Sequence, residues 1–263
     1  FDIPEEWLQR DIFIQIGAAK TGLYVYINGK EVGYSEDSKS PSEFLINDYV
    51  IPGENVVTLK VFKHTSGSYL EDQDMWRLGG IERDVVLYCQ PKTHIKDFNI
   101  ISTLDDQYIH GILKINVSLI NHEKTAKDVT LFYELYESDD KTILVQGSKA
   151  IKIESNQKVK LTFTDQSILN VRQWSAEQPN LYKIVFTLKA SSTDKIIEAV
   201  PFRVGFRRLE ISTTLFEEKS YFVLLFNGKE VLYKGVNLHE HNPKTGHYVT
   251  LDIFKKDIEM LKK

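Results

Sequence analysis

Apolar and polar residues alternate in four segments in the middle of this 263-residue chain: 112–119, 128–135, 158–163 and 182–188. A period of two places successive side chains on opposite faces of a β-strand, so one face can be buried while the other meets water. Polar turns separate the segments, which predicts an immunoglobulin-like β-sandwich over residues 92–206. Trp174 precedes its last strands and is interpreted as a core anchor, with a ligand contact as the alternative.

Residues 1–91 also carry β signals. Residues 23–27 lead into Asn28-Gly29, a strong signal for a two-residue hairpin turn, and residues 30–34 return. Strands recur at spacings near ten residues without a helical stretch between them, which predicts another β-sandwich. The segment 66–83 is then a long loop on this sandwich, where binding residues tend to lie.

The sequence changes character over residues 207–263. Residues 222–226 meet a second Asn-Gly turn, residues 229–233 follow it, and the polar loop KGVNLHEHNPKTGH leads to a helix with Thr250 as its expected N-cap. Strand, loop and helix predict the first βα unit of a (β/α)8 barrel, whose chemistry lies in the loops after the strands. The chain starts without Met and stops at Lys263 inside this helix, so we expect it to be an internal fragment with a truncated first domain.

Composition narrows the classes of partner. A net charge of −4 provides no basic face, so we expect no nucleic-acid partner. The single cysteine, Cys89, lies in an apolar run, which indicates a buried, inert thiol. No apolar run approaches the roughly 18 residues that span a bilayer, and no signal peptide opens the chain, so we expect no membrane partner. The compartment, cytoplasmic or periplasmic, stays open.

Residues 66–85 combine types that a simple connection between strands does not need. Residues 69–77 alone hold three carboxylates, two aromatic residues and an arginine, and a second arginine follows: Glu71, Asp72, Asp74, Tyr69, Trp76, Arg77 and Arg83. Sugar sites use this mixture, because carboxylates accept hydrogen bonds from hydroxyls while the apolar face of the sugar lies on an aromatic ring. The alternative is a surface acid cluster paired to the two arginines.

His239 and His241 flank Glu240 in the polar loop. Their spacing differs from that of zinc ligands four residues apart on a helix, although positions i and i+2 of an extended loop can point the same way. We prefer a neutral imidazole that donates a hydrogen bond to a substrate hydroxyl or to the transition state. A structural histidine bonded to the loop backbone is the competing interpretation.

Four motifs occur in the order found in family 2 β-galactosidases of the bacterial lactase type: DSKSPSEF at 37–44, GSYLEDQDMWRLGGIERDV at 67–85, WSAEQPNLY at 174–182 and FNGKEVLYKGVNLHEHNPKTGH at 226–247. The chain therefore resembles that family over nearly its whole length. The resemblance implies a jelly-roll sugar-binding domain over residues 1–91, an immunoglobulin-like domain, and the start of a (β/α)8 catalytic barrel. It also implies a β-galactoside substrate and a homo-oligomeric enzyme.

Family roles carry over where the motifs match. Asp74 resembles the residue that binds galactosyl hydroxyls and helps to hold sodium, and His239 resembles the histidine that stabilises the transition state. Glu71 and Trp76 are expected to support the loop. The resemblance implies a retaining mechanism with two catalytic glutamates and a magnesium site, all expected in later barrel strands outside this chain. Glu240 matches neither glutamate.

Two kinds of alternative remain. The chain could come from another family 2 glycosidase, such as a β-glucuronidase or a β-mannosidase, although the loop at 67–85 favours the galactosidase branch. It could also be a non-catalytic carbohydrate-binding module, or a structural module that serves as an oligomerisation surface.

Overall fold

The computed structural model describes residues 1–71, 76–216 and 219–263. Within these ranges the chain forms two compact units. One consists of Phe1–Gln90 together with Val236–Lys263, and the other of Pro91–Gly235. The domain boundaries after residues 91 and 206 stay a prediction.

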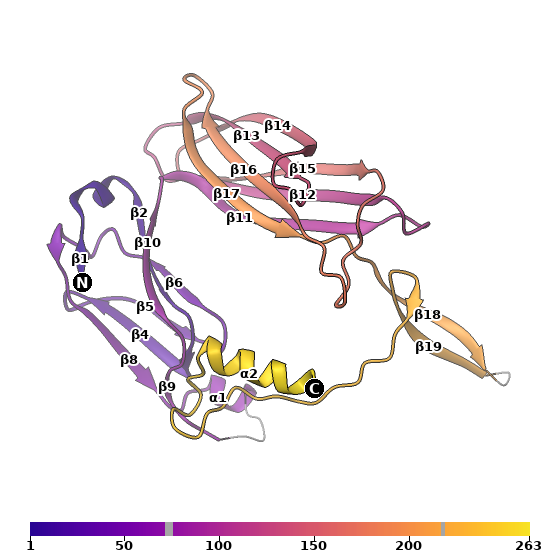
Figure 1. Ribbon diagram of the computed structural model, residues 1–263. Helices are drawn as coiled ribbons and strands as arrows, with labels where there is room; N and C mark the ends of the chain where they lie inside the picture. Colours follow the sequence, from indigo (N-terminus) through magenta and orange to yellow (C-terminus); the bar gives the residue numbers. More distant parts are fainter. Residues whose placement is uncertain (72–75, 217–218) are drawn as a thin grey trace. The chain divides into compact units, whose positions relative to one another are not determined.

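The first unit contains small antiparallel sheets (Figure 1). The two larger ones have three strands each, in the orders β10-β2-β6 and β5-β4-β8. Its elements before residue 91 are β1 (Asp2–Ile3), a 3-10 helix (Glu5–Gln9), β2 (Asp11–Ile16), β3 (Ala19–Lys20), β4 (Gly22–Ile27), β5 (Lys30–Glu36), β6 (Ser42–Leu45), β7 (Gly53–Glu54), β8 (Val57–Phe62), α1 (Gly67–Leu70), β9 (Gly80–Ile81) and β10 (Val85–Gln90). The predicted long loop at 66–83 thus includes one helical turn and a short strand that pairs with β3.

Alternating residues build the core of the first unit. Ile12, Ile14 and Ile16 of β2 are almost fully buried, and alternating residues of β4 pack against them in one cluster. The predicted turn between β4 and β5 is confirmed, because Asn28 and Gly29 both have positive φ, at 50° and 78°. Left-handed conformations at both central residues suit the twist of a hairpin, which explains why this pair of residues occurs there.

The second unit is a β-sandwich with sheet orders β11-β12-β15 and β14-β13-β16-β17, followed by the smaller sheet β18-β19-β20 (Figure 1). Its strands are β11 (Thr93–Leu104), β12 (Gly111–Asn121), β13 (Lys127–Tyr136), β14 (Ile143–Ile153), β15 (Gln157–Ile168), β16 (Tyr182–Ala190), β17 (Ile196–Val204), β18 (Leu209–Phe216), β19 (Lys219–Phe226) and β20 (Lys229–Glu230). The four strands predicted from alternation are confirmed as β12, β13, β15 and β16.

Burial in the second unit follows the sequence period. Every second residue of β12 is buried from Gly111 to Asn121, and β13 and β16 alternate in the same way. Leu131, Phe186 and Val117 meet in one core cluster with residues from both sheets. The alternation did not identify β11, β14 or β17, since many of their residues are exposed on both faces and the apolar period is therefore weak.

The region predicted as a βα unit contains the predicted hairpin turn and the predicted helix, but one of its strands is shorter than predicted. Asn227 and Gly228 form the second hairpin turn, and the helix forms as α2 (Leu251–Leu261), with Thr250 at the N-cap position. The strand expected at 229–233 is wrong beyond its first two residues, because only Lys229 and Glu230 pair with β19. A barrel strand is held by parallel neighbours on both sides, and the described residues supply none for this segment.

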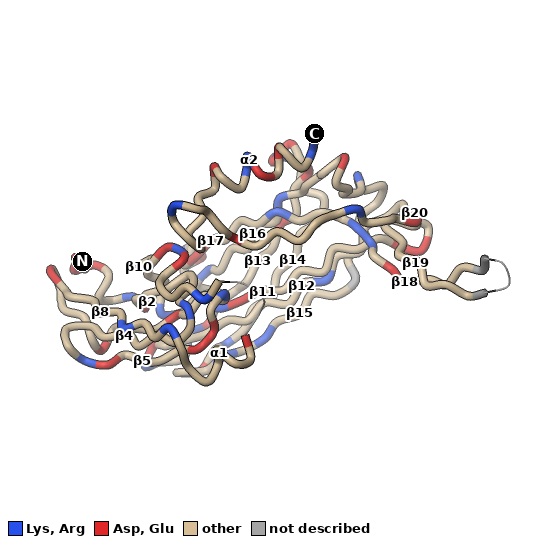
Figure 2. The backbone as a smooth tube through the Cα atoms, turned by 90° about the horizontal axis from the view of Figure 1, so that it is seen from below, with Lys and Arg blue, Asp and Glu red and all other residues tan. Residues whose placement is uncertain are grey.

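Lysine and arginine residues are interspersed with aspartate and glutamate along the described chain (Figure 2). Within the described ranges, no helix combines the length and the apolar character that crossing a bilayer needs.

Candidate functional site

The first unit contains a cavity of about 480 Å³ between the loops of its sandwich and the segment 238–240. Acidic, basic and hydroxyl side chains line it: Lys20, Thr21, Asp37, Ser38, Lys39, Lys63, His64, Ser68, Glu71, Arg77, Arg83, Leu238, His239 and Glu240. The cavity therefore brings the loop after β8 together with the loop that carries the HEH motif, although more than 160 residues separate the two in the sequence.

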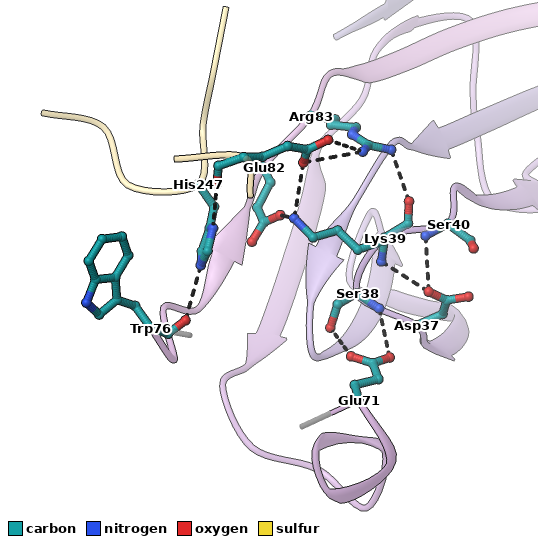
Figure 3. Close-up of polar contacts among 10 residues, drawn as sticks. Asp37, Ser38, Lys39, Ser40, Glu71, Trp76, Glu82, Arg83 and His247 are labelled. Atoms are coloured by element: carbon teal, nitrogen blue, oxygen red, sulfur yellow. Dashed lines mark hydrogen bonds and ion pairs between the residues drawn. The ribbon is translucent and has the colours of Figure 1, made fainter. Parts of the chain in front are cut away.

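One wall of the cavity is a short turn at residues 37–40 that two carboxylates hold in place (Figure 3). Asp37 accepts the backbone N–H groups of Lys39 and Ser40, each at 3.1 Å, and the bond from Lys39 is the main reason that the pKa of Asp37 is lowered. Glu71 accepts the backbone N–H of Ser38 at 3.0 Å and also its hydroxyl. Glu71 thus supports the loop, as predicted, and its bonds to Ser38 differ from the arginine pairing of the alternative acid-cluster interpretation.

A second wall is an ion-pair network. Lys39 Nζ lies 2.5 Å from Glu82 and 3.2 Å from Glu240, and Arg83 lies 3.1 Å from Glu240 (Figure 3). Burial by itself raises the pKa of Glu240, but the hydrogen bond and charge of Lys39, followed by those of Arg83, outweigh burial and lower that pKa. Glu240 is therefore an ionised residue held between two cations.

A histidine that sequence reasoning missed joins the two loops. Asn242 and Gly246 exchange two backbone hydrogen bonds, of 2.8 and 2.9 Å, so the chain reverses and returns His247 toward Glu240. The buried ring of His247 lies 3.0 Å from the carbonyl of Glu240 through Nδ1 and 3.2 Å from the carbonyl of Trp76 through Nε2 (Figure 3). Carbonyl oxygens only accept, and a neutral imidazole has one N–H, so both contacts are hydrogen bonds only when the ring is doubly protonated.

Trp76 contacts the HEH segment as well. Its ring centroid lies 3.9 Å from that of His241, with the planes tilted by 47°. Trp76 thus supports the loop, as predicted, through contacts with both His241 and His247. The backbone-bonded histidine that we considered for the HEH pair is instead His247, which lies beyond the motif.

Of the two predicted site residues, His239 lies within the described ranges and Asp74 does not. His239 lines the cavity beside Glu240 and shares it with Glu71. Asp74 lies outside the described residues, so its position relative to His239 stays a prediction. Across residues 1–71, 76–216 and 219–263, no three His, Cys, Asp or Glu side chains form a group suited to a metal ion. Asp74, the predicted sodium ligand, lies outside these ranges, so the sodium site stays a prediction.

Cys89 and Trp174 are both half-buried, so the predictions of a buried thiol and of a core anchor are met only in part. Cys89 packs at the edge of the core of the first unit, and burial is the main cause of its raised pKa, which disfavours a reactive thiolate. In the second unit, the ring centroid of Trp174 lies 6.0 Å from that of Phe226, and the guanidinium of Arg207 lies 4.8 Å above the indole.

The cavity offers suitable partners for a ligand that carries several hydroxyl groups. The carboxylate of Asp37 offers an acceptor, while Lys63, His64 and the ring of His239 can supply donors. Such groups can bind a polyhydroxyl ligand by many hydrogen bonds and need no large apolar surface.

Three family descriptions match nearly the whole chain. Residues 1–91 match "Glycosyl hydrolases family 2, sugar binding domain", residues 93–207 match "Glycosyl hydrolases family 2", and residues 218–263 match "Glycosyl hydrolases family 2, TIM barrel domain". Together with the strands described above, these matches confirm the predicted fold class: a jelly-roll-like sugar-binding sandwich, an immunoglobulin-like sandwich and the beginning of a (β/α)8 barrel.

Curated relatives include a beta-galactosidase of Halalkalibacterium halodurans and one of Streptococcus thermophilus, each 36% identical over all of this chain. The chain spans 24% of the length of each. A beta-galactosidase large subunit of Lactobacillus acidophilus is 35% identical, and the chain covers 39% of it.

Solved structures share the fold at low sequence identity. A Bacteroides uniformis beta-glucuronidase superimposes with a TM-score of 0.87 at 20% identity, over 100% of this chain and 31% of that one. A β-glucuronidase of Ruminococcus gnavus reaches 0.78 at 20% identity, over 100% of this chain and 42% of that one. With three successive family domains and relatives at 36% identity along its full length, the chain belongs to glycosyl hydrolase family 2.

Proposed function

We propose that this chain belongs to a retaining β-galactosidase that removes terminal non-reducing β-D-galactose from β-galactosides. The observation that carries the proposal is the shared cavity, which His239 lines together with Asp37 and Glu71, the carboxylates that hold one of its walls. The relatives named beta-galactosidase, at 36% identity over all of this chain, support the choice of sugar.

Two residues carry the proposed sugar contacts. Asp74 accepts hydrogen bonds from galactosyl hydroxyls, and these charge-assisted bonds are stronger than neutral ones. His239, as a neutral imidazole, donates to a hydroxyl of the ring as positive charge develops at the anomeric carbon. Galactoside cleavage passes through an oxocarbenium-like transition state, so hydrogen bonds that tighten there lower the barrier.

The catalytic glutamates complete the mechanism from outside this chain. One acts as acid and base, and the other forms the covalent glycosyl intermediate. In this proposal they lie in later barrel strands together with the magnesium ligands, and Asp74 would help to hold a sodium ion. Glu240, which both Lys39 and Arg83 bind, has no such role.

The roles of Asp74 and His239 can be tested in the complete enzyme. Removing a contact made in the transition state costs on the order of 2 to 4 kcal/mol, so Asp74→Ala and His239→Ala should each lower kcat on a galactoside at least about a hundredfold. Asp194→Asn, which removes the charge of an exposed acid paired with Lys189 at a position of positive φ that asparagine tolerates, is the control and should keep kcat. Near wild-type turnover in either site variant would exclude the role given to that residue.

The chain by itself should be inactive. We expect no release of nitrophenol from a nitrophenyl β-galactoside by the 263-residue chain, because both proposed catalytic glutamates lie elsewhere. Measurable turnover that survives repurification would contradict this assignment. In the complete enzyme, faster cleavage of a nitrophenyl β-glucuronide or β-mannoside than of the galactoside would select another branch of the family.

A non-catalytic sugar-binding module is the second candidate, and the same cavity favours it. It requires the isolated chain to bind galactose well, whereas part of a galactosidase site should bind galactose only weakly. Titration of the chain with galactose, followed by NMR, separates the two. The proposed homo-oligomer is checked by sedimentation of the complete enzyme.

A further inference from the structure

Glu240 lies directly after His239, and its side chain is the centre of the ion-pair network that forms one wall of the cavity. Its carboxylate is 34% exposed and lies 3.2 Å from Lys39 Nζ and 3.1 Å from the guanidinium of Arg83. The proposed reaction does not use this carboxylate, although it is adjacent in sequence to the residue assigned to the transition state.

Both cations are fixed before they meet Glu240. Lys39 also pairs with Glu82, whose side chain is only 7% exposed, and Arg83 donates to the backbone carbonyl of Lys39 at 3.0 Å. The sandwich therefore presents two positive charges that are each held by a further contact, which reduces the side-chain freedom lost when Glu240 binds them.

The backbone of Glu240 is held as well. Its carbonyl oxygen lies 3.0 Å from Nδ1 of His247, whose other nitrogen contacts the carbonyl of Trp76 on the sandwich loop. Glu240 is thus anchored to the sandwich through its side chain and, by way of His247, through its main chain. A residue anchored at two points restricts the backbone dihedrals of its neighbour, which here is His239.

We propose that Glu240 is a positioning residue: by binding Lys39 and Arg83 it orients the His239 ring into the cavity. The catalytic importance of that orientation rests on the proposed function of His239. The orientation itself is a property of the chain, and it can be measured without turnover.

The first test uses the 263-residue chain, whose seven histidines include His239. The imidazole Cε1–H signal of His239 is assigned by its loss in His239→Gln and then followed in Glu240→Gln, which keeps the size of the side chain and removes its charge. We expect the signal to move toward the position of a histidine in an unfolded chain. Glu240→Asp, which keeps the charge, should restore part of the wild-type position, and Asp194→Asn should change nothing.

Arg83→Gln tests the partner. If Glu240 acts through Arg83, then Glu240→Gln and Arg83→Gln should shift the His239 signal by similar amounts, and the double variant should shift it little further. Additive shifts, or an unchanged His239 signal in Glu240→Gln with the rest of the spectrum intact, would overturn the proposal.

The second test measures kinetics in the complete enzyme. Misplacement of a catalytic group lowers turnover more than ground-state binding, so we expect Glu240→Gln to reduce kcat on a galactoside between about tenfold and a hundredfold with little change in KM. An equal kcat in an active enzyme would overturn the positioning role. If the wild-type enzyme cleaves no galactoside, the proposed function fails, while the His239 signal still decides whether Glu240 orients the ring.

Discussion

His247 provides the sharpest test of how the HEH loop is attached to the sandwich. Its side chain is nearly buried, at 5% residue exposure, and its two nitrogens lie 3.0 and 3.2 Å from carbonyl oxygens of Glu240 and Trp76. His247→Leu replaces the imidazole with an apolar side chain of similar bulk and removes both ring nitrogens. The substitution therefore deprives two partly buried carbonyl groups of their partner and makes no large cavity.

The expected magnitude follows from these two contacts. Leaving a buried acceptor unsatisfied costs about 1–3 kcal/mol, and a neutral imidazole donates one hydrogen bond, so we take about 2 kcal/mol for the loss of that bond. A loss of about 2 kcal/mol raises the equilibrium constant for local opening about 30-fold. Hydrogen exchange followed by mass spectrometry should therefore show about 30-fold faster exchange in peptides that cover residues 236–247.

A histidine of the other unit provides the control. His110→Leu removes a histidine that accepts one hydrogen bond from the Asn170 N–H in the other unit, and it should leave exchange in residues 236–247 unchanged. If His247→Leu changes exchange there less than about threefold, corresponding to under about 0.7 kcal/mol, the two contacts do not hold the loop.

Two further predictions concern stability and pH. Asn121 is fully buried and bonds the backbone at Thr125, Ile153 and Glu154 as well as the Thr93 hydroxyl. Asn121→Ala should therefore lower the free energy of unfolding of its unit, measured by urea titration, by about 2–4 kcal/mol. An unchanged midpoint of the titration would contradict this. The pKa of Glu240 is lowered from 4.5, so its stabilising contribution is complete above that value and is lost as pH falls through the folded-state pKa. Exchange in residues 236–247, corrected for intrinsic rates, should therefore rise below about pH 4.5 in the wild type, and a rise of the same size in Glu240→Gln would refute the assignment.

The amino-acid sequence by itself determined the elements that depend on local patterns. Alternation predicted β12, β13, β15 and β16, because a strand buried on one face needs an apolar residue at every second position. The two Asn-Gly pairs predicted both hairpin turns, because those residues adopt positive φ readily. The EDQD and HEH motifs each contribute a described residue to the cavity, Glu71 and His239.

Only the tertiary structure decided how those segments meet. Glu240 binds Lys39, which lies 201 residues earlier, and His247 contacts Trp76 across 171 residues. No periodicity or local motif encodes such pairs, because an ion pair or a bridging ring depends on which loops the packed sheets bring side by side. The sequence therefore marked His239 as a site residue but assigned no role to Glu240 and overlooked His247, whose functions exist only once the HEH loop lies against the sandwich.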